Sequence, residues 1–287
     1  MKIAIMPNLT RETARAVTKS CCNELEKLGI DYCFSSALRD ELKEYPSSVF
    51  CTDDCFVDES DYVISIGGDG SMLRAAKIAA QKNKKILGIN AGRLAYLCSL
   101  DADEMHLLSA LKDEKFTLQS RMMLKAQLFR DEKKIYENFC INDIVFSRVA
   151  DIGLIDLSVH ANGKNIGDYL ADGLILATPT GSTGYSLSAG GPVIEPTLEA
   201  IALSPICPHS LAVRPYVFSA STVFEVSCRL RAGDVNVGFS CDGEKTVLLD
   251  ESAVVRITKA ETSAQFISIK SDNFIDVLKK KLEIKKI

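Results

Sequence analysis

The stretch Val63-Ile-Ser-Ile-Gly-Gly-Asp-Gly-Ser71 decides the fold, because it carries a buried β-strand through a turn of glycines into a helix. Glycine has no Cβ, so the turn can adopt positive φ and bring backbone N–H groups close to a polyanion. Residues 71–82 show apolar positions at helical spacing, and the positive end of that helix points at the turn. Such turns also arise for geometric reasons alone, so the rest of the chain must decide whether Asp69 lies in a phosphate site.

The residues around this turn alternate between strand and helix patterns. Strands are predicted over 2–6, 31–35, 62–66 and 85–89, and helices over about 10–28, 71–82 and 102–113. This alternation is typical of a parallel sheet covered by helices. Residues 1–115 are therefore predicted to form an α/β nucleotide-binding domain. Its ligand side lies at the carboxyl ends of the strands, where the glycine turn and Asn90-Ala-Gly-Arg93 both emerge.

The pattern changes after residue 115 to short strand-like runs separated by turn residues, which predicts a β-rich, β-sandwich-like domain over 116–258. Residues 259–287 are predicted to return to the first domain, with a helical pattern over 274–285. The predicted strands of the second domain are 124–130, 134–137, 143–147, 153–160, 173–178, 222–228, 235–240, 246–249 and 253–258.

The composition limits the partners of the chain. Its 287 residues include 34 basic and 38 acidic ones, and the net charge of −4 gives no general attraction to nucleic acid or to an anionic membrane. The first residues alternate like a strand and lack the apolar core of a secretory signal, and no run reaches the eighteen apolar residues of a membrane helix. We therefore expect a cytoplasmic protein with a small-molecule partner.

Ten cysteines raise the question of metal binding or disulfides. They form no CxxC pair, and Cys51-Thr-Asp-Asp-Cys55 lacks the second pair that structural zinc needs. Reduced and mostly buried thiols are the better interpretation. The three histidines are far apart in the sequence and are interpreted as structural; they are His106, His160 and His209.

A second unusual segment runs over 171–192, where an apolar strand leads into a long loop of hydroxyl residues and glycines. Hydroxyl groups can donate and accept hydrogen bonds, and glycines let the backbone approach a nucleoside closely. A solvated turn is the alternative, but an ordinary turn does not need so many small residues in a row. The hydroxyls expected to face a polar ligand are Ser182, Thr183, Tyr185, Ser186 and Ser188.

Two further sets of polar residues interrupt apolar sequence. Asn142 and Asp143 stand within Phe139-Cys-Ile-Asn-Asp-Ile-Val-Phe146, and buried polar groups need partners. Asn142 can pair with adenine and Asp143 can accept hydrogen bonds from ribose hydroxyls, although both can instead bond to nearby backbone. Asp242-Gly-Glu244 taken alone is interpreted as a tight hairpin turn.

Together these segments resemble the NAD kinase family, whose members phosphorylate the 2′-hydroxyl of the adenosine ribose of NAD with ATP or polyphosphate. The resemblance covers nearly the whole chain. The glycine turn is shared with other kinases, whereas the run from Thr178 to Pro192 is specific. The matching motifs, in family order, are 67–71, 90–97, Asn142-Asp143, 172–192, Pro208-His-Ser-Leu211, Arg214-Pro215 and Asp242-Gly-Glu244.

The resemblance implies a role for each matching residue. Asp69 deprotonates the ribose hydroxyl, which agrees with the need for an acceptor beside a phosphate site in phosphoryl transfer. Gly70 lies near the phosphates, Asn142 and Asp143 hold the adenosine, and Asp172 contacts the nicotinamide half. Arg74 can neutralise phosphate or, as the alternative, is a solvated residue on the helix. The remaining implied ligand contacts are Thr183, Gly184, Tyr185, Ser186, Leu187, Ser188 and Glu244.

The resemblance also implies the cofactor and the partners. Mg²⁺ or another divalent cation arrives with ATP and is held mainly by its phosphates, without a protein metal cage. Family membership further implies a homodimer or homotetramer. Four positions depart from the common pattern: Leu94-Ala95-Tyr96 replaces Leu-Gly-Phe, Gly184 replaces alanine, Leu170 stands where a basic residue is frequent, and Glu244 replaces glutamine. The last two lose a cation and gain an anion, which would weaken substrate binding if both side chains face a dinucleotide phosphate.

Two other functions stay open at this point. A lipid kinase of the diacylglycerol or sphingoid class shares the glycine turn, but the hydroxyl-rich loop suits a nucleotide better than an acyl chain. A catalytically silent NAD(P)-binding protein is the second alternative, and the presence of Asp69 argues against it.

Overall fold

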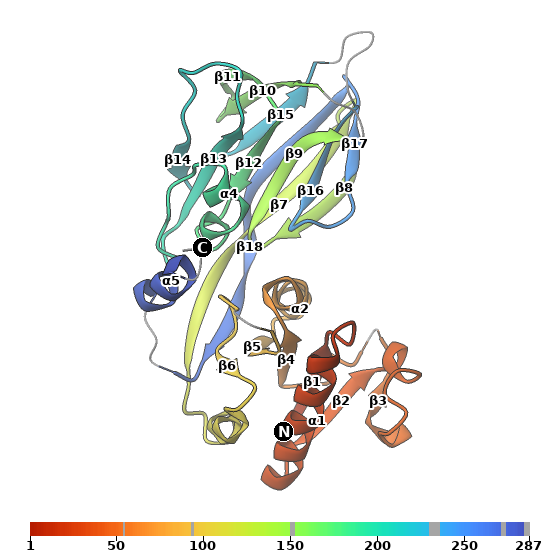
Figure 1. Ribbon diagram of the computed structural model, residues 1–287. Coiled ribbons are helices and arrows are strands. Elements are labelled where there is room, and N and C mark those ends of the chain that lie inside the picture. The colour runs from red at the N-terminus through yellow and green to blue at the C-terminus, as the bar shows by residue number, and fades with distance from the viewer. Residues whose placement is uncertain (54, 93–94, 150–152, 230–235, 271–273, 284–287) are drawn as a thin grey trace. The chain divides into compact units, whose positions relative to one another are not determined.

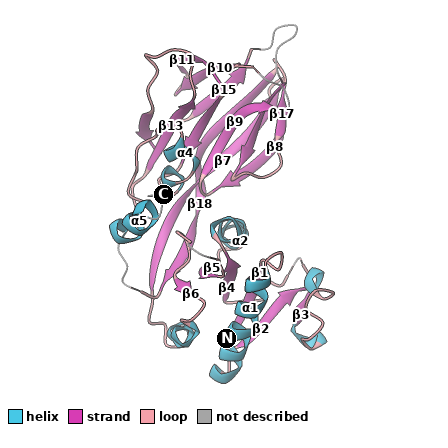
Figure 2. Ribbon diagram, viewed as in Figure 1, coloured by secondary structure: helices cyan, strands magenta, loops and turns pink. Residues whose placement is uncertain are grey.

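The computed structural model describes residues 1–53, 55–92, 95–149, 153–229, 236–270 and 274–283, and the chain divides into two compact units. Unit 1 comprises Met1–Ser120 together with Ala264–Ile287, and unit 2 comprises Arg121–Ser263. Unit 1 mixes helices with strands, whereas unit 2 consists almost entirely of strands (Figure 1 and Figure 2). This is the predicted fold class, an α/β domain with a β-rich domain. Within the described ranges no helix has the length and apolar character needed to cross a membrane.

Unit 1 is built on a parallel sheet in the order β5-β4-β1-β2-β3, with the end of β18 and the short β6 also pairing with β5. Its strands are β1 (Lys2–Pro7), β2 (Asp31–Ser35), β3 (Phe50–Cys51), β4 (Tyr62–Gly67), β5 (Lys85–Asn90) and β6 (Leu100–Asp101). Its helices are α1 (Glu12–Leu28), α2 (Asp69–Gln81), α3 (Ser109–Lys112) and α5 (Phe274–Glu283), with 3₁₀ turns at Ser36–Leu38, Ser47–Val49 and Met105–Leu108.

The central strand and the long helix of unit 1 follow directly from the sequence pattern. Every residue of β4 is buried, as expected for a parallel strand that is covered on both faces. Helix α1 buries Ala14, Val17, Cys21 and Leu25, which recur at helical spacing on one face. It ends where Gly29 takes the left-handed conformation at φ 68° and returns its N–H to the last helical turn. These elements enclose the core of unit 1.

Unit 2 contains two antiparallel sheets. One has the order β11-β10-β15-β18 and also includes β7 and β8, and the other has the order β14-β13-β12-β9-β16-β17. The first sheet contains β7 (Thr117–Arg130), β8 (Lys133–Cys140), β10 (Ile155–Ala161), β11 (Lys164–Ala171), β15 (Phe224–Cys228) and β18 (Ala253–Ser268). The second contains β9 (Asp143–Val149), β12 (Gly173–Ala177), β13 (Ala200–Ile206), β14 (Tyr216–Ser219), β16 (Asn236–Cys241) and β17 (Val247–Leu249).

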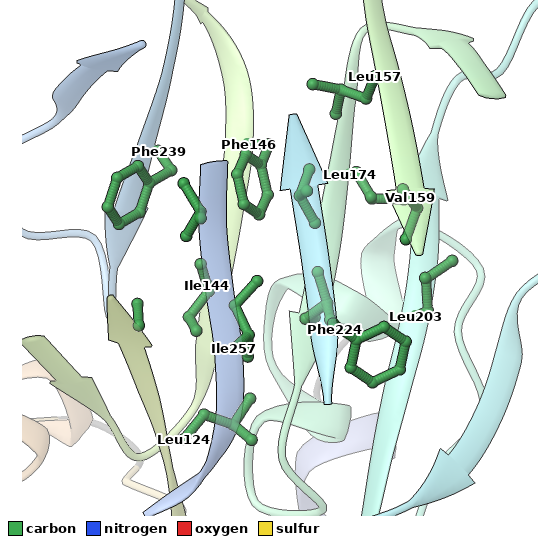
Figure 3. Close-up of a cluster of buried hydrophobic side chains, with 14 of the residues drawn as sticks. Leu124, Ile144, Phe146, Leu157, Val159, Leu174, Leu203, Phe224, Phe239 and Ile257 are labelled. Atoms are coloured by element: carbon green, nitrogen blue, oxygen red, sulfur yellow. The ribbon is translucent and has the colours of Figure 1, made fainter. Parts of the chain in front are cut away.

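One hydrophobic core lies between these two sheets, as the inward-pointing side chains in Figure 3 show. Leu157, Phe224 and Ile257 enter it from the first sheet, and Phe146 and Leu174 enter it from the second. The rings of Phe146 and Phe239 stack at 5.8 Å between centroids. The alternation of buried and partly buried positions along β15 fits this packing, and the sandwich-like prediction is confirmed.

Every residue of strand β12 is buried, so the strand is covered on both faces. Leu174 and Leu176 face the main core, while Ile175 and Ala177 pack with Ile194 in a separate cluster. Ile194 belongs to the segment that follows the hydroxyl-rich loop. The loop, with its 3₁₀ turn Gly181–Thr183 and the short α4 (Tyr185–Ser188), therefore belongs to a segment that folds back over the outer face of the sheet.

The prediction that the cysteines are mostly buried is confirmed. All ten are free, six are buried, and Cys207 is exposed. Over the described part of the chain, no group of three or more His, Cys, Asp or Glu side chains is arranged to hold a metal ion.

Candidate active site

Asp69 is the first residue of α2, two residues earlier than the sequence pattern predicts for the start of this helix. Its oxygen Oδ1 accepts hydrogen bonds from the backbone N–H groups of Tyr96 at 2.7 Å and Leu97 at 2.8 Å. Gly67 pairs with Asn90 across β4 and β5, so the glycine turn and the 90–97 segment emerge at the same edge. Two separate stretches of sequence thus fix one carboxylate at a helix N-terminus.

Positive φ does not explain why the three positions of the turn are glycine. Gly68 has φ −108°, and neither Gly67 nor Gly70 is among the residues with positive φ. A Cβ on Gly67 would lie 2.5 Å from Ser71 Oγ, so close packing excludes a side chain there. A Cβ on Gly68 or Gly70 would meet no atom within 4 Å. The prediction of positive φ was therefore wrong. The open space beside Gly68 and Gly70 leaves room for a phosphate group.

Other residues around the turn have assigned partners. Ser71 Oγ accepts a hydrogen bond from Asn8 Nδ2 at 2.9 Å, and Asn90 Nδ2 donates to Asp101 Oδ1 at 2.9 Å. Arg74 is exposed on α2, so its expected phosphate contact stays a prediction. Arg93 and Leu94, part of the motif over 90–97, lie outside the described residues.

In unit 2, Asn142 and Asp143 stand where β8 gives way to β9, and Asp242 holds the backbone there. The Asp242 carboxylate accepts hydrogen bonds from the N–H groups of Ile141 at 2.8 Å, Asn142 at 2.7 Å and Asp143 at 3.2 Å. Asp143 is buried, and burial followed by the charge of Asp242 raises the pKa of its carboxyl group to about 7. The buried Oδ1 of Asn142 has no hydrogen-bond partner among the described residues.

The start of the hydroxyl-rich loop packs directly against this pair. Thr178 donates its N–H to Asn142 O at 2.8 Å and its hydroxyl to Ile141 O at 2.5 Å. A Cβ on Gly181 would lie 2.1 Å from Asn142 O, so only glycine fits there. A Cβ on Gly184 would lie 3.2 Å from Gly181 O, a tight contact with backbone, and 3.5 Å from Asn142 Nδ2. The loop and the Asn142-Asp143 pair form one local site within unit 2.

Several hydroxyls expected to face a ligand are instead used inside unit 2. Ser182 is fully buried and bonds to the backbone of Pro179 and Ile194. Thr183 donates to Thr180 O at 3.2 Å, and Ser186 shares a hydrogen bond with Ser204 at 3.0 Å. These hydroxyls order the loop, because the loop covers apolar sheet and its polar groups need internal partners.

The other predicted contacts on this loop remain accessible. Tyr185 is half exposed, Ser188 is exposed, and Leu187 is partly buried. The buried hydroxyl of Thr180 has no partner among the described residues. If this loop contacts a ligand, the accessible side chains and the backbone make that contact.

Asp172 and Glu244 are the two predicted acidic contacts, and each is held by a side chain that the sequence did not indicate. Arg148 Nη1 donates to Asp172 Oδ1 in an ion pair, and both side chains are about one-third exposed. Asn138 Nδ2 donates to Glu244 Oε2 at 2.9 Å. Leu170 is 44% exposed.

Sequence reasoning missed Asp242 as an organising residue and interpreted it only as part of a hairpin. The residue has φ 50°, a conformation that aspartate tolerates better than most side chains. Its three hydrogen bonds reach residues 99 to 101 positions earlier. The available signal was a carboxylate directly before a glycine in a turn. Its hydrogen-bond partners are far away in the sequence, so a local sequence pattern could not identify them.

Comparison with protein families identifies both parts of the chain. Residues 3–113 match the ATP-NAD kinase N-terminal domain, and residues 141–269 match the ATP-NAD kinase C-terminal domain. The NAD kinase of Caldanaerobacter subterraneus subsp. tengcongensis is 33% identical over 282 residues, covering 98% of each chain. The NAD kinase of Desulforamulus reducens is 39% identical over 226 residues, covering 78% of each chain.

Solved structures agree with these matches. A yeast NADH kinase complexed with NADH has a TM-score of 0.90 at 22% identity, covering 100% of this chain and 89% of that chain, and it supports the fold alone. An NAD kinase from Archaeoglobus fulgidus in complex with ATP has a TM-score of 0.72 at 26% identity, covering 99% of each chain. Neither the lipid-kinase nor the silent-binding alternative gains support from these matches. The chain therefore belongs to the ATP-NAD kinase family and is a kinase.

Proposed function

We propose that this chain transfers the terminal phosphoryl group of ATP to the 2′-hydroxyl of the adenosine ribose of NAD, producing NADP. The observation that carries the proposal is the fixed carboxylate of Asp69, which accepts two backbone N–H groups beside open space at Gly68 and Gly70. Phosphoryl transfer to a hydroxyl depends mainly on positioning and on stabilisation of charge, with one acceptor for the hydroxyl proton. Asp69 is that acceptor, and the N-terminal turn of α2 offers N–H groups to phosphate.

The adenosine half of NAD is assigned to Asn142 and Asp143. The unpartnered Oδ1 of Asn142 can accept from the exocyclic amine of adenine, which would satisfy a buried acceptor. Asp143 can accept from a ribose hydroxyl as the carboxylate, or donate to one when it is protonated, because its pKa lies at about 7. Thr183 to Ser188 border the dinucleotide, with Tyr185 and Ser188 as the accessible side chains. Asp172 contacts the nicotinamide half.

Mg²⁺ or another divalent cation is proposed to enter with ATP. The phosphates of ATP supply most of its ligands, as is usual for Mg²⁺ at kinase sites. When bound, the cation neutralises phosphate charge during transfer. Arg74, exposed one helical turn beyond Gly70, is a second candidate for phosphate contact.

An enzyme-coupled assay that detects NADP tests the proposed reaction. We expect NADP to accumulate when the full chain is given NAD, ATP and Mg²⁺. Failure to form NADP with ATP or polyphosphate, with either Mg²⁺ or Mn²⁺, would refute the proposal and favour a silent binding protein. The ATP and polyphosphate arms also determine the donor range.

Binding measurements separate the lipid-kinase alternative from the proposal. Isothermal calorimetry with NAD should give saturable binding, and a short-chain diacylglycerol should give none. The opposite result would favour the lipid kinase. We also propose a homodimer or homotetramer in the cytoplasm; a mass measurement in solution tests the assembly, and cell fractionation tests the location.

A further inference from the structure

Arg148 lies near the end of β9, and Asp172 lies opposite it, directly before the start of β12 in unit 2. Ser147 of β9 pairs with Gly173 of β12, so the next residues, Arg148 and Asp172, face each other where the paired segment ends. The guanidinium donates to Asp172 Oδ1 and, at 3.3 Å, to the carbonyl oxygen of Gly153. One arginine therefore binds a side-chain acceptor beside β12 and a main-chain acceptor in the segment before β10.

The carboxylate of Asp172 is fixed from its own backbone as well. Its N–H donates to Ile206 O at 3.0 Å, which attaches it to the end of β13. Within the described ranges, Asp172 Oδ2 makes no hydrogen bond. The backbone and Arg148 thus set the direction of the carboxylate and leave one oxygen able to accept.

The sheet itself gains little from this ion pair. Arg148 and Asp172 are each about one-third exposed, and pairs this accessible contribute little to stability. Leu170, two residues before Asp172, brings no positive charge and is 44% exposed. Among the described side chains, Arg148 is the cation that pairs with Asp172.

We propose that Arg148 is a positioning residue that aims the second oxygen of Asp172 at the carboxamide N–H group of the nicotinamide ring. This inference rests on the proposed function, because it concerns how NAD is held. A carboxylate only accepts hydrogen bonds, so the amide N–H of the carboxamide is its natural partner. Without Arg148 the carboxylate can rotate, and the gain from pre-organisation is lost.

The test compares NAD with ADP-ribose, which carries the same adenosine and diphosphate but no nicotinamide. Calorimetry on the full chain should show that Arg148→Met weakens NAD binding by about three- to fivefold, as expected for an accessible charged contact, and leaves ADP-ribose binding unchanged. Asp172→Asn should weaken NAD selectively to a similar extent. Arg148→Lys should recover part of the loss, because it restores the charge without the guanidinium fork.

Arg229→Met is the matched control. Arg229 also pairs with an aspartate at the surface of unit 2, since its Nη2 lies 2.9 Å from Asp168 Oδ2. This control should leave both affinities unchanged, and its thermal midpoint gives the cost of losing a surface ion pair.

Three outcomes would overturn the inference, and they differ from failure of the proposed function. Equal losses for NAD and ADP-ribose in Arg148→Met would mean that the arginine only supports the sheet. Wild-type affinities in both Arg148→Met and Arg148→Lys would remove its role altogether. An Asp172→Asn variant that loses both ligands equally would separate Asp172 from the nicotinamide. Failure of the proposed function appears earlier and separately, as a wild-type chain that does not bind NAD.

Discussion

Asp69 in unit 1 and Asp143 in unit 2 are the same residue type in opposite surroundings. Asp69 begins a helix, and two backbone N–H groups hold its carboxylate. Asp143 is buried near a second carboxylate, that of Asp242, and its pKa is raised to about 7. The backbone fixes the first as an acceptor, whereas burial and a like charge let the second change its protonation near neutral pH.

The largest effect is expected from removing the acceptor in unit 1. Asp69→Asn should lower kcat by a factor of about 10² to 10⁴, the usual contribution of a positioned base, while NAD binding stays measurable. The coupled NADP assay gives kcat, and calorimetry gives the affinity. Asp58→Asn is the matched control, because Asp58 forms an accessible ion pair with Lys82 in the same unit. Near-wild-type turnover of Asp69→Asn would show that another group accepts the proton.

The second effect concerns the pH dependence of stability and should be specific to Asp143. A carboxyl whose pKa rises from 3.8 to about 7 on folding keeps its proton in the folded state after the unfolded state has lost it. Stability should therefore fall as the pH rises from about 4 to about 7, by a few kcal/mol in total from this group. Asp143→Asn removes the titration, so its stability relative to wild type should rise over the same range.

Urea unfolding at several pH values measures this difference. Wild type and Asp143→Asn should be closest in stability near pH 4 and furthest apart above pH 7, with the variant more stable. Parallel profiles would mean that Asp143 titrates with an ordinary pKa. The same urea unfolding measurements on Asp69→Asn provide the comparison from unit 1.

The third effect concerns Asp242, whose carboxylate holds the backbone around Asp143. Asp242→Ala removes the acceptor of three N–H groups and should lower the free energy of unfolding by about 1–3 kcal/mol. Urea unfolding at a fixed pH measures the loss. Asp168→Ala, at the surface of the same unit, should cost less than about 0.5 kcal/mol. Equal small losses in both variants would mean that water replaces Asp242 at these groups.

The sequence predicted the main elements of unit 1 closely because their signals are local, although it missed the two-residue strands β3 and β6. The helix predicted over 102–113 is a 3₁₀ turn followed by the short α3. Strand β4, the glycines after it and α2 follow one another without a gap, and burial on both faces gives β4 a continuous apolar run. Unit 2 was harder, and three of its strands were missed. Strand β14 is mostly exposed, β11 carries exposed polar residues, and β13 contains Pro205, a residue that argues against a central strand.

The candidate site could be predicted only where its residues are sequence neighbours. Asn142 and Asp143 interrupt an apolar run, so their polarity was visible. Arg148 and Asp242 act through partners that are 24 to 101 residues away, and those contacts exist only after the strands have paired. The hydroxyl-rich loop was recognised as unusual, yet its pattern could not tell a hydroxyl that faces a ligand from one that bonds internally, as Ser186 does with Ser204.

The smallest effects test whether the glycines beside Asp69 serve the fold or a phosphate. Gly70→Ala adds a methyl group where no atom lies within 4 Å, so the fold should tolerate it and gain up to about 0.5–1 kcal/mol from better helix propensity. If phosphate occupies that space, KM for ATP should rise by about two- to fivefold. Gly67→Ala is the contrast, since its Cβ would lie 2.5 Å from Ser71 Oγ and should destabilise unit 1. Thermal unfolding and ATP kinetics on both variants give the comparison. An unchanged KM for ATP in a stable Gly70→Ala chain would show that phosphate does not approach this turn. A raised KM for ATP without loss of stability would show that the ligand occupies the open space.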